Sequence, residues 1–87
     1  MTKTEIKRAI NKAVYEYVTS LGYEIADDTD GSCVTFIPNN CHDVYEMIEY
    51  SRSYHETYVL KSALEETKAD ANKIDEFAKE QMRKYGV

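Results

Sequence analysis

The fold of this chain is decided by residues 22–50, which read GYEIADDTDGSCVTFIPNNCHDVYEMIEY. Two short runs rich in β-forming residues, 23–27 and 33–37, flank a polar segment containing Asp-Gly, a strong hairpin signal. In the second run Val34 and Phe36 fall on one face, so we expect this pair to point into the core. A two-stranded hairpin is only marginally stable, so it must pack on helices. A third strand is expected only from a partner or a second copy, which would leave an exposed edge as a candidate binding element.

A helix is predicted before the hairpin, over about residues 3–21. Its apolar residues recur at three- and four-residue intervals, which gives one continuous stripe. Thr2 and Glu5 fit a capping box at its start, and Gly22 stands where a helix end requires positive φ.

The half of the chain after the hairpin is predicted to be all helical, because it has neither Gly nor Pro between Cys41 and Tyr85. Helices are expected at about 41–52, 54–69 and 72–85. The last two could instead form one helix of about 30 residues. A turn near 70–72 is favoured, because it allows the apolar faces of all the helices to pack into one small core. The predicted fold class is therefore α+β, a small single domain over residues 1–87 in the order α-β-β-α-α.

Charge is distributed unevenly along the 87 residues, whose formal net charge is −5. Residues 1–21 carry +2, residues 51–87 are neutral, and residues 22–50 contain seven acids and no Lys or Arg. A base-free acidic block attracts cations or basic protein surfaces, and it disfavours direct nucleic-acid binding, which needs clustered Lys and Arg. The hydrophobic content of 43% is that of a folded globular protein.

The expected location is the cytoplasm, with no membrane contact. Two cysteines are too few for a disulfide framework, and no apolar run approaches the length of a membrane span, about 20 residues. The first residues lack the apolar core of a signal peptide.

Part of the hairpin turn resembles a calcium loop, because Asp28, Asp30 and Gly31 match three of its positions. In that register, however, the first ligand position is Ala26 and the twelfth is Ile37, so two ligands are missing. A polar hairpin tip is the better interpretation.

The soft metal ligands of the chain are Cys33, Cys41, His42 and His55, whose spacing matches no zinc pattern. Cys41 and His42 are adjacent, so their side chains diverge on a helix, and Asp43 opposes a lowered thiol pKa. We therefore expect no catalytic site, no metal and no cofactor.

The candidate binding residues are the acids of the central block together with nearby tyrosines. Asp43, Glu46 and Glu49 are three apart, which predicts a carboxylate row on one helix face. Tyr50, Tyr54 and Tyr58 are four apart, which predicts a line of rings that either covers the edge of the core or forms a contact surface. The complete predicted partner-binding set is Glu24, Asp27, Asp28, Asp30, Asp43, Glu46, Glu49, Tyr23, Tyr45, Tyr50, Tyr54 and Tyr58.

The function expected from this pattern is non-enzymatic protein binding, in which carboxylates occupy the basic groove of a nucleic-acid-handling protein. The chain contains no family motif. In size and charge it is similar to the inhibitors that phages and mobile elements use against defence enzymes, anti-CRISPR proteins included. The alternative is a structural or regulatory protein that forms a homodimer or a helical interface through its C-terminal apolar stripe, with Ile74, Phe77 and Met82 in the contact.

Overall fold

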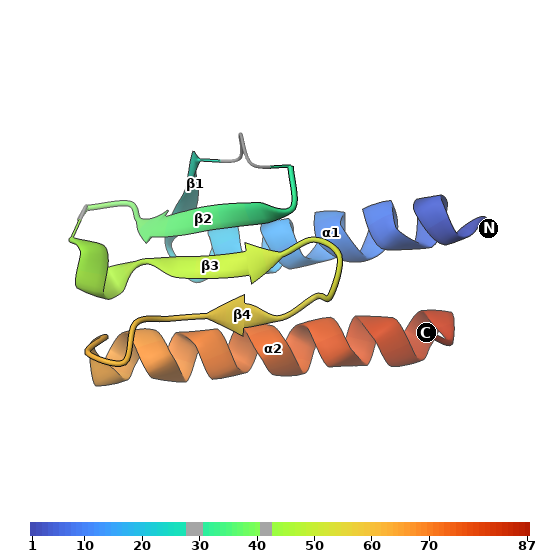
Figure 1. The fold of residues 1–87 in the computed structure, drawn as a ribbon. Helices are drawn as coiled ribbons and strands as arrows, with labels where there is room; N and C mark the ends of the chain where they lie inside the picture. The colour runs from blue at the N-terminus through green and yellow to red at the C-terminus, as the bar shows by residue number, and fades with distance from the viewer. Residues whose placement is uncertain (28–30, 41–42) are drawn as a thin grey trace.

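The fold consists of two long helices and a four-stranded antiparallel sheet (Figure 1). One helix comes before the sheet in the sequence and the other comes after it. The computed structural model describes residues 1–27, 31–40 and 43–87. The elements in chain order are α1 (Lys3–Ser20), β1 (Tyr23–Asp27), β2 (Cys33–Pro38), the 3-10 turn η1 (Val44–Glu46), β3 (Ile48–Ser51), β4 (Thr57–Tyr58) and α2 (Glu65–Tyr85). The predicted α+β class is confirmed.

Helix α1 forms as its sequence predicts. The Thr2 hydroxyl accepts from the Glu5 backbone N–H at 3.1 Å, and the Glu5 carboxylate accepts from the Thr2 N–H, which completes the capping box. The helix ends at the cap residue Leu21, and Gly22 follows with φ of 96°. Glycine adopts this backbone without a Cβ penalty, so the chain can turn directly into β1.

The hairpin of β1 and β2 is also confirmed, but it is half of a larger sheet. The strand order is β1-β2-β3-β4, and all neighbours are antiparallel. The third strand comes from the chain itself, so the expectation that only a partner could supply it was wrong.

Residues 41–52 do not form the predicted helix. The described part of this range holds η1 and then β3, where Ile48 and Tyr50 are buried and Glu49 between them is exposed. This alternation has the period of a strand with one covered face. The absence of Gly and Pro was therefore a misleading signal for a helix. A strand of only four residues, such as β3, needs neither residue inside it, and its two-residue alternation was overlooked.

Residues 54–69 likewise contain no helix until α2 begins at Glu65. A turn passes through His55, which has the left-handed φ of 56°, and leads into β4. Helix α2 then runs unbroken through residues 70–72, so the predicted turn there was wrong. One stripe, formed by Ala71, Ile74 and Ala78, faces the core along the helix, and a break would have misaligned it.

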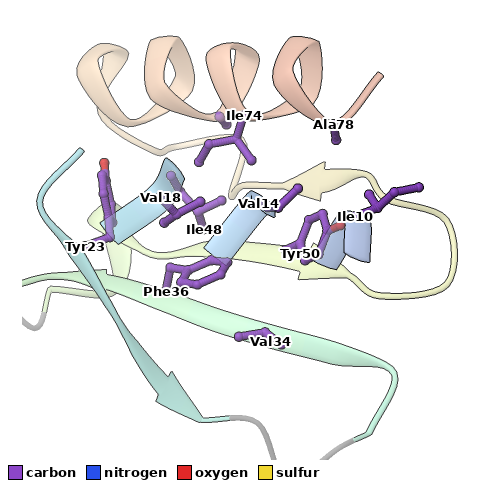
Figure 2. Packing of buried hydrophobic residues seen from close by; sticks show 11 residues of the cluster. Ile10, Val14, Val18, Tyr23, Val34, Phe36, Ile48, Tyr50, Ile74 and Ala78 are labelled. Atoms are coloured by element: carbon purple, nitrogen blue, oxygen red, sulfur yellow. The ribbon is translucent and has the colours of Figure 1, made fainter. Parts of the chain in front are cut away.

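The core lies between one face of the sheet and the two helices. Figure 2 shows Val14 and Val18 of α1 between Ile74 of α2 and the sheet residues Phe36 and Ile48. Val34 and Phe36 are buried, as predicted from their alternation in β2. Ile74 is fully buried within the chain, and the Phe77 ring stacks on Tyr17 at 4.4 Å, so α1 covers part of the apolar stripe of α2, whereas Phe77 and Met82 stay partly exposed.

The two edge strands of the sheet are protected in different ways. At the β4 edge, the Asp75 carboxylate of α2 accepts from the Thr57 backbone N–H at 2.7 Å, and the Thr57 hydroxyl donates to the Ala71 carbonyl at 3.1 Å. Helix α2 therefore covers that edge. At the other edge, β1 carries an irregularity between Ile25 and Asp27, a device that discourages strand pairing between molecules. None of the described helices is long and apolar enough to span a membrane.

Candidate functional site

The candidate site is a cavity of about 220 Å³ at the end of the molecule where α1 finishes and α2 begins. Three carboxylates line it, from Glu46 of η1 and from Glu66 and Asp70 of α2. No Lys or Arg is among its lining residues. Its other walls are apolar or neutral and consist of Leu21, Gly22, Tyr23, Pro38, Leu64 and Thr67. We call this feature the acidic cavity.

Backbone hydrogen bonds bring these elements together. The Asn39 N–H donates to the Gly22 carbonyl at 3.0 Å, which joins the end of β2 to the turn after α1. The Leu64 N–H donates to the Tyr45 carbonyl at 3.3 Å, which fixes the start of α2 beside η1. The Asp43 carboxylate accepts from the Tyr45 N–H at 2.9 Å and so shapes the turn that holds Glu46. The cavity is thus assembled from four separate segments.

Tyr23 is the central side chain of the acidic cavity. It is almost fully buried, and its hydroxyl donates to the Asp70 carboxylate at 2.8 Å. Burial raises the pKa of Tyr23 above its ordinary value, and the hydrogen bond and the charges of Asp70, Glu66 and Glu46 raise it further. The hydroxyl therefore stays protonated at neutral pH and acts as a donor. The charges of all three carboxylates therefore act on the Tyr23 hydroxyl.

Such a cavity suits a cationic group on an aliphatic stem. Carboxylates form charge-assisted hydrogen bonds with guanidinium and ammonium groups, and apolar walls cover the methylenes behind them. Asp70 already has a cationic partner, because the Lys73 ammonium lies 3.9 Å from its carboxylate. Glu46 and Glu66 make no ion pair among the described residues, so their carboxylates are available to bind a cationic ligand. The described residues include no cluster of His, Cys, Asp and Glu that could hold a metal ion.

A second acidic feature is the outer sheet face, the side of the sheet opposite to the helices. The register places Glu24 beside Ile37, and Thr35 in one row with Glu49 and Tyr58. Both carboxylates are exposed, and the four strands contain no Lys or Arg. The Tyr58 hydroxyl donates to Glu56 at 3.0 Å, a bond that raises the pKa of Tyr58. Beside this row, Glu49 and Tyr58 line a further cavity of about 220 Å³ together with Met47, Val59 and Leu60, but Glu49 is its only carboxylate.

The structure separates the predicted binding residues into groups. Glu46 and Tyr23 lie in the acidic cavity, and Glu24, Glu49 and Tyr58 lie on the outer sheet face. Asp28 and Asp30 are outside the described residues, and Asp27 is in β1, where only its backbone is described. Asp43 directly precedes η1 and Tyr45 belongs to it, and both residues are exposed.

Two predicted rows do not exist. Asp43, Glu46 and Glu49 share no helix face, because Glu46 is in η1 and Glu49 is in β3. The tyrosine line is also wrong: Tyr50 is fully buried in β3, Tyr54 is 72% exposed in a turn, and Tyr58 is on the opposite face of the sheet. Strand alternation, rather than a helical period of four, decides where each ring points.

Glu66 and Asp70 were not predicted to belong to the site. The signal that could have found them is their spacing of four residues, which places both carboxylates on one face of the first turns of α2. That spacing indicates a shared face only if the start of the helix is known, and the helix was predicted to begin near 54 or 72 instead of at Glu65.

We expect Tyr23→Phe to lower the free energy of unfolding by about 1–3 kcal/mol, because the Asp70 carboxylate loses a donor in a partly buried position. Urea denaturation followed by circular dichroism measures this change. Tyr45→Phe is the matched control, since Tyr45 is exposed, and we expect its stability to stay within about 0.5 kcal/mol of wild type. Equal stability of Tyr23→Phe and wild type would contradict the prediction.

Comparison with known proteins adds no relative to these observations: no family model matches the chain, and neither curated proteins nor solved structures gave a match.

Proposed function

We propose that this protein is a non-enzymatic binding module whose acidic cavity accepts an arginine or lysine side chain from the basic surface of another protein. The observation that carries the proposal is the composition of that cavity: three carboxylates, apolar walls and no basic lining residue. An arginine fits this arrangement best, because its planar guanidinium pairs with two carboxylates while its stem contacts apolar walls.

The outer sheet face supports the same kind of partner. Glu24 and Glu49 are exposed on strands without a single Lys or Arg, and the chain as a whole carries a net charge of −5. Complementary charge speeds encounter with a basic surface and fixes orientation, while the apolar walls of the acidic cavity supply the desolvated contact.

The class of partner that we propose is a protein with a groove that otherwise holds nucleic acid. Such grooves present rows of Arg and Lys, to which successive carboxylates can bind in place of phosphates. The biological role would then be inhibition, of the kind that phages and mobile elements direct against nucleic-acid-handling defence enzymes.

The alternative interface through α2 would have to form on side chains that already pack, fully or in part, within the protein. Ile74 is fully buried, and Phe77 and Met82 pack against the same cluster. We therefore do not propose a helical dimer through that stripe.

The test compares two double variants with the same change of charge. Glu46→Lys/Glu66→Lys reverses the two available carboxylates of the acidic cavity, and Glu16→Lys/Glu80→Lys reverses two exposed ones elsewhere on the helices. Each protein is titrated into a panel of purified nucleic-acid-binding proteins holding a labelled DNA duplex, at low and high salt. Displacement of the duplex reports binding.

We expect wild type to displace the duplex at low salt, and the cavity variant to require at least about tenfold more protein. The control variant should lose far less, because its reversed charges lie away from the cavity. Circular dichroism checks that both variants stay folded. If both variants lose displacement equally, net charge alone is responsible and the cavity has no special role. If the cavity variant displaces as well as wild type, the proposal fails.

A further inference from the structure

A second cavity lies at the opposite end of the helices, near the residues marked N and C in Figure 1. Its volume is about 220 Å³, and α1, the turn between β3 and β4, and the end of α2 all contribute to it. Three apolar side chains form what we call the apolar floor: Ile6, Ile10 and Met82. Lys3, Lys7, Ser53 and His55 supply its polar lining, and Val87 also contributes to it.

The charge here is opposite to that of the acidic cavity. Lys3 and Lys7 are the charged side chains of the lining, and no carboxylate side chain belongs to it. Neither lysine forms an ion pair within the described part of the chain. They lie on α1, in the segment of residues 1–21 that carries +2 although the whole chain is at −5. The lysines therefore create a local preference for an anion.

His55 is held in one orientation by a chain of hydrogen bonds. The Tyr50 hydroxyl lies 2.9 Å from the side-chain oxygen of Asn11 and 2.8 Å from Nδ1 of His55. An amide oxygen can only accept, so the Tyr50 O–H donates to Asn11 and the hydroxyl oxygen accepts from Nδ1–H of His55. This leaves Nε2 as the ring atom with a lone pair and no protein partner among the described residues.

Two further properties of His55 set it apart from an ordinary turn residue. It is only 5% exposed, and its backbone has φ of 56°, a left-handed conformation that is costly for a residue other than glycine. Burial, and then the charge of Lys7, lower the pKa of the imidazole below its usual value, so the ring is neutral at pH 7. Strained and buried polar residues of this kind gather at binding sites.

We propose that this cavity binds a short aliphatic carboxylate, whose chain fills the apolar floor and whose headgroup meets the two lysines. The apolar floor gains from burial of each methylene, and the lysines select an anion over a neutral or cationic headgroup. The bound carboxylate also favours a proton on Nε2 of His55, because the neutral ring offers only a lone pair there.

The groups that bear on His55 are Lys7 on α1, whose charge lowers the pKa of the imidazole, and Tyr50 on β3, whose hydroxyl is hydrogen-bonded to Nδ1, and Lys3 lines the same cavity. Met82 of α2 and Val87, which follows the helix cap, also line the cavity and have side chains that do not titrate. Burial raises the pKa of Tyr50, which therefore stays protonated. His55 is accordingly the group whose protonation should change when the carboxylate binds.

The probes are butanoate, hexanoate and octanoate, with hexylamine as the cationic control of matched chain length. Binding is followed by nuclear magnetic resonance, through the backbone amides of Ile6 and Met82 and the ring nitrogens of His55. We expect saturable shifts with the carboxylates, and affinity that rises about fourfold per added methylene until the cavity is full. Hexylamine should produce no saturable shift at these positions. Binding should also tighten as pH falls towards the titration of His55.

Lys3→Gln/Lys7→Gln tests the headgroup contact, and Lys12→Gln, an exposed change on the same helix, is the control. The double variant should bind hexanoate about tenfold more weakly, and the control should match wild type. His55→Asn retains a side chain that tolerates left-handed backbone, and it should abolish the pH dependence while some affinity remains. Equal binding of hexylamine and hexanoate, the absence of saturable shifts, or unchanged affinity in the double lysine variant would each overturn the proposal.

Discussion

Phe36→Ala is expected to lower the free energy of unfolding by about 3–5 kcal/mol. The Phe36 side chain is almost fully buried at the centre of the sheet, and its ring contacts Tyr15 edge-on at a centroid distance of 5.9 Å and Tyr50 at 6.4 Å. Truncation removes apolar burial and leaves a cavity that neighbouring rings cannot fill completely. An 87-residue domain has a total stability of only about 4–13 kcal/mol, so this loss would unfold much of the protein at physiological temperature.

Urea denaturation at several temperatures measures the effect. Tyr54→Ala is the matched control, because it also truncates an aromatic side chain but one that is 72% exposed, and its cost should stay near 0.5 kcal/mol. A loss below about 1 kcal/mol for Phe36→Ala would show that the ring is not part of a packed core.

Glu49→Pro is expected to destabilise the protein by about 3 kcal/mol or more, although the Glu49 side chain is exposed and contributes nothing to the core. Glu49 stands in β3, opposite Thr35 of β2 on one side and Tyr58 of β4 on the other. Proline cannot donate to the strand ladder and does not fit an internal strand.

Two milder substitutions distinguish a strand from the helix that residues 41–52 were predicted to form. In a strand, Glu49→Thr should be at least as stable as wild type and more stable than Glu49→Ala, because β-branched residues favour a pleated surface. In a helix the order would reverse, since alanine is the best helix former. Thermal unfolding of the three variants measures the order, and a more stable Glu49→Ala would contradict the assignment of β3.

Within the first 38 residues, the described parts, 1–27 and 31–38, were predicted well because their signals are local. A capping box at Thr2, a positive-φ glycine at Gly22 and a two-residue alternation around Phe36 each act within a few positions of the sequence. Steric preferences and hydrogen bonds within one turn are sufficient to specify such elements, and the structure shows them with almost the predicted boundaries.

Residues 43–69 were predicted poorly because their structure depends on distant parts of the chain. The stretch around Ile48 has apolar spacing that fits a helix or a short strand, and what favours the strand is the open edge of β2 beside it. Likewise β4 is held by Asp75 of α2, a contact across 18 residues. No local pattern can contain that information.

The candidate site shows the same division. The sequence alone determined that the centre of the chain is acidic and free of Lys and Arg, because composition does not depend on folding. Only the tertiary structure decided which acids meet. In the folded protein Tyr50 lies in the core and Glu49 lies on the outer sheet face. Glu46 lines one cavity with Glu66 and Asp70, because a cavity forms where separate elements end together and not where residues are neighbours in sequence.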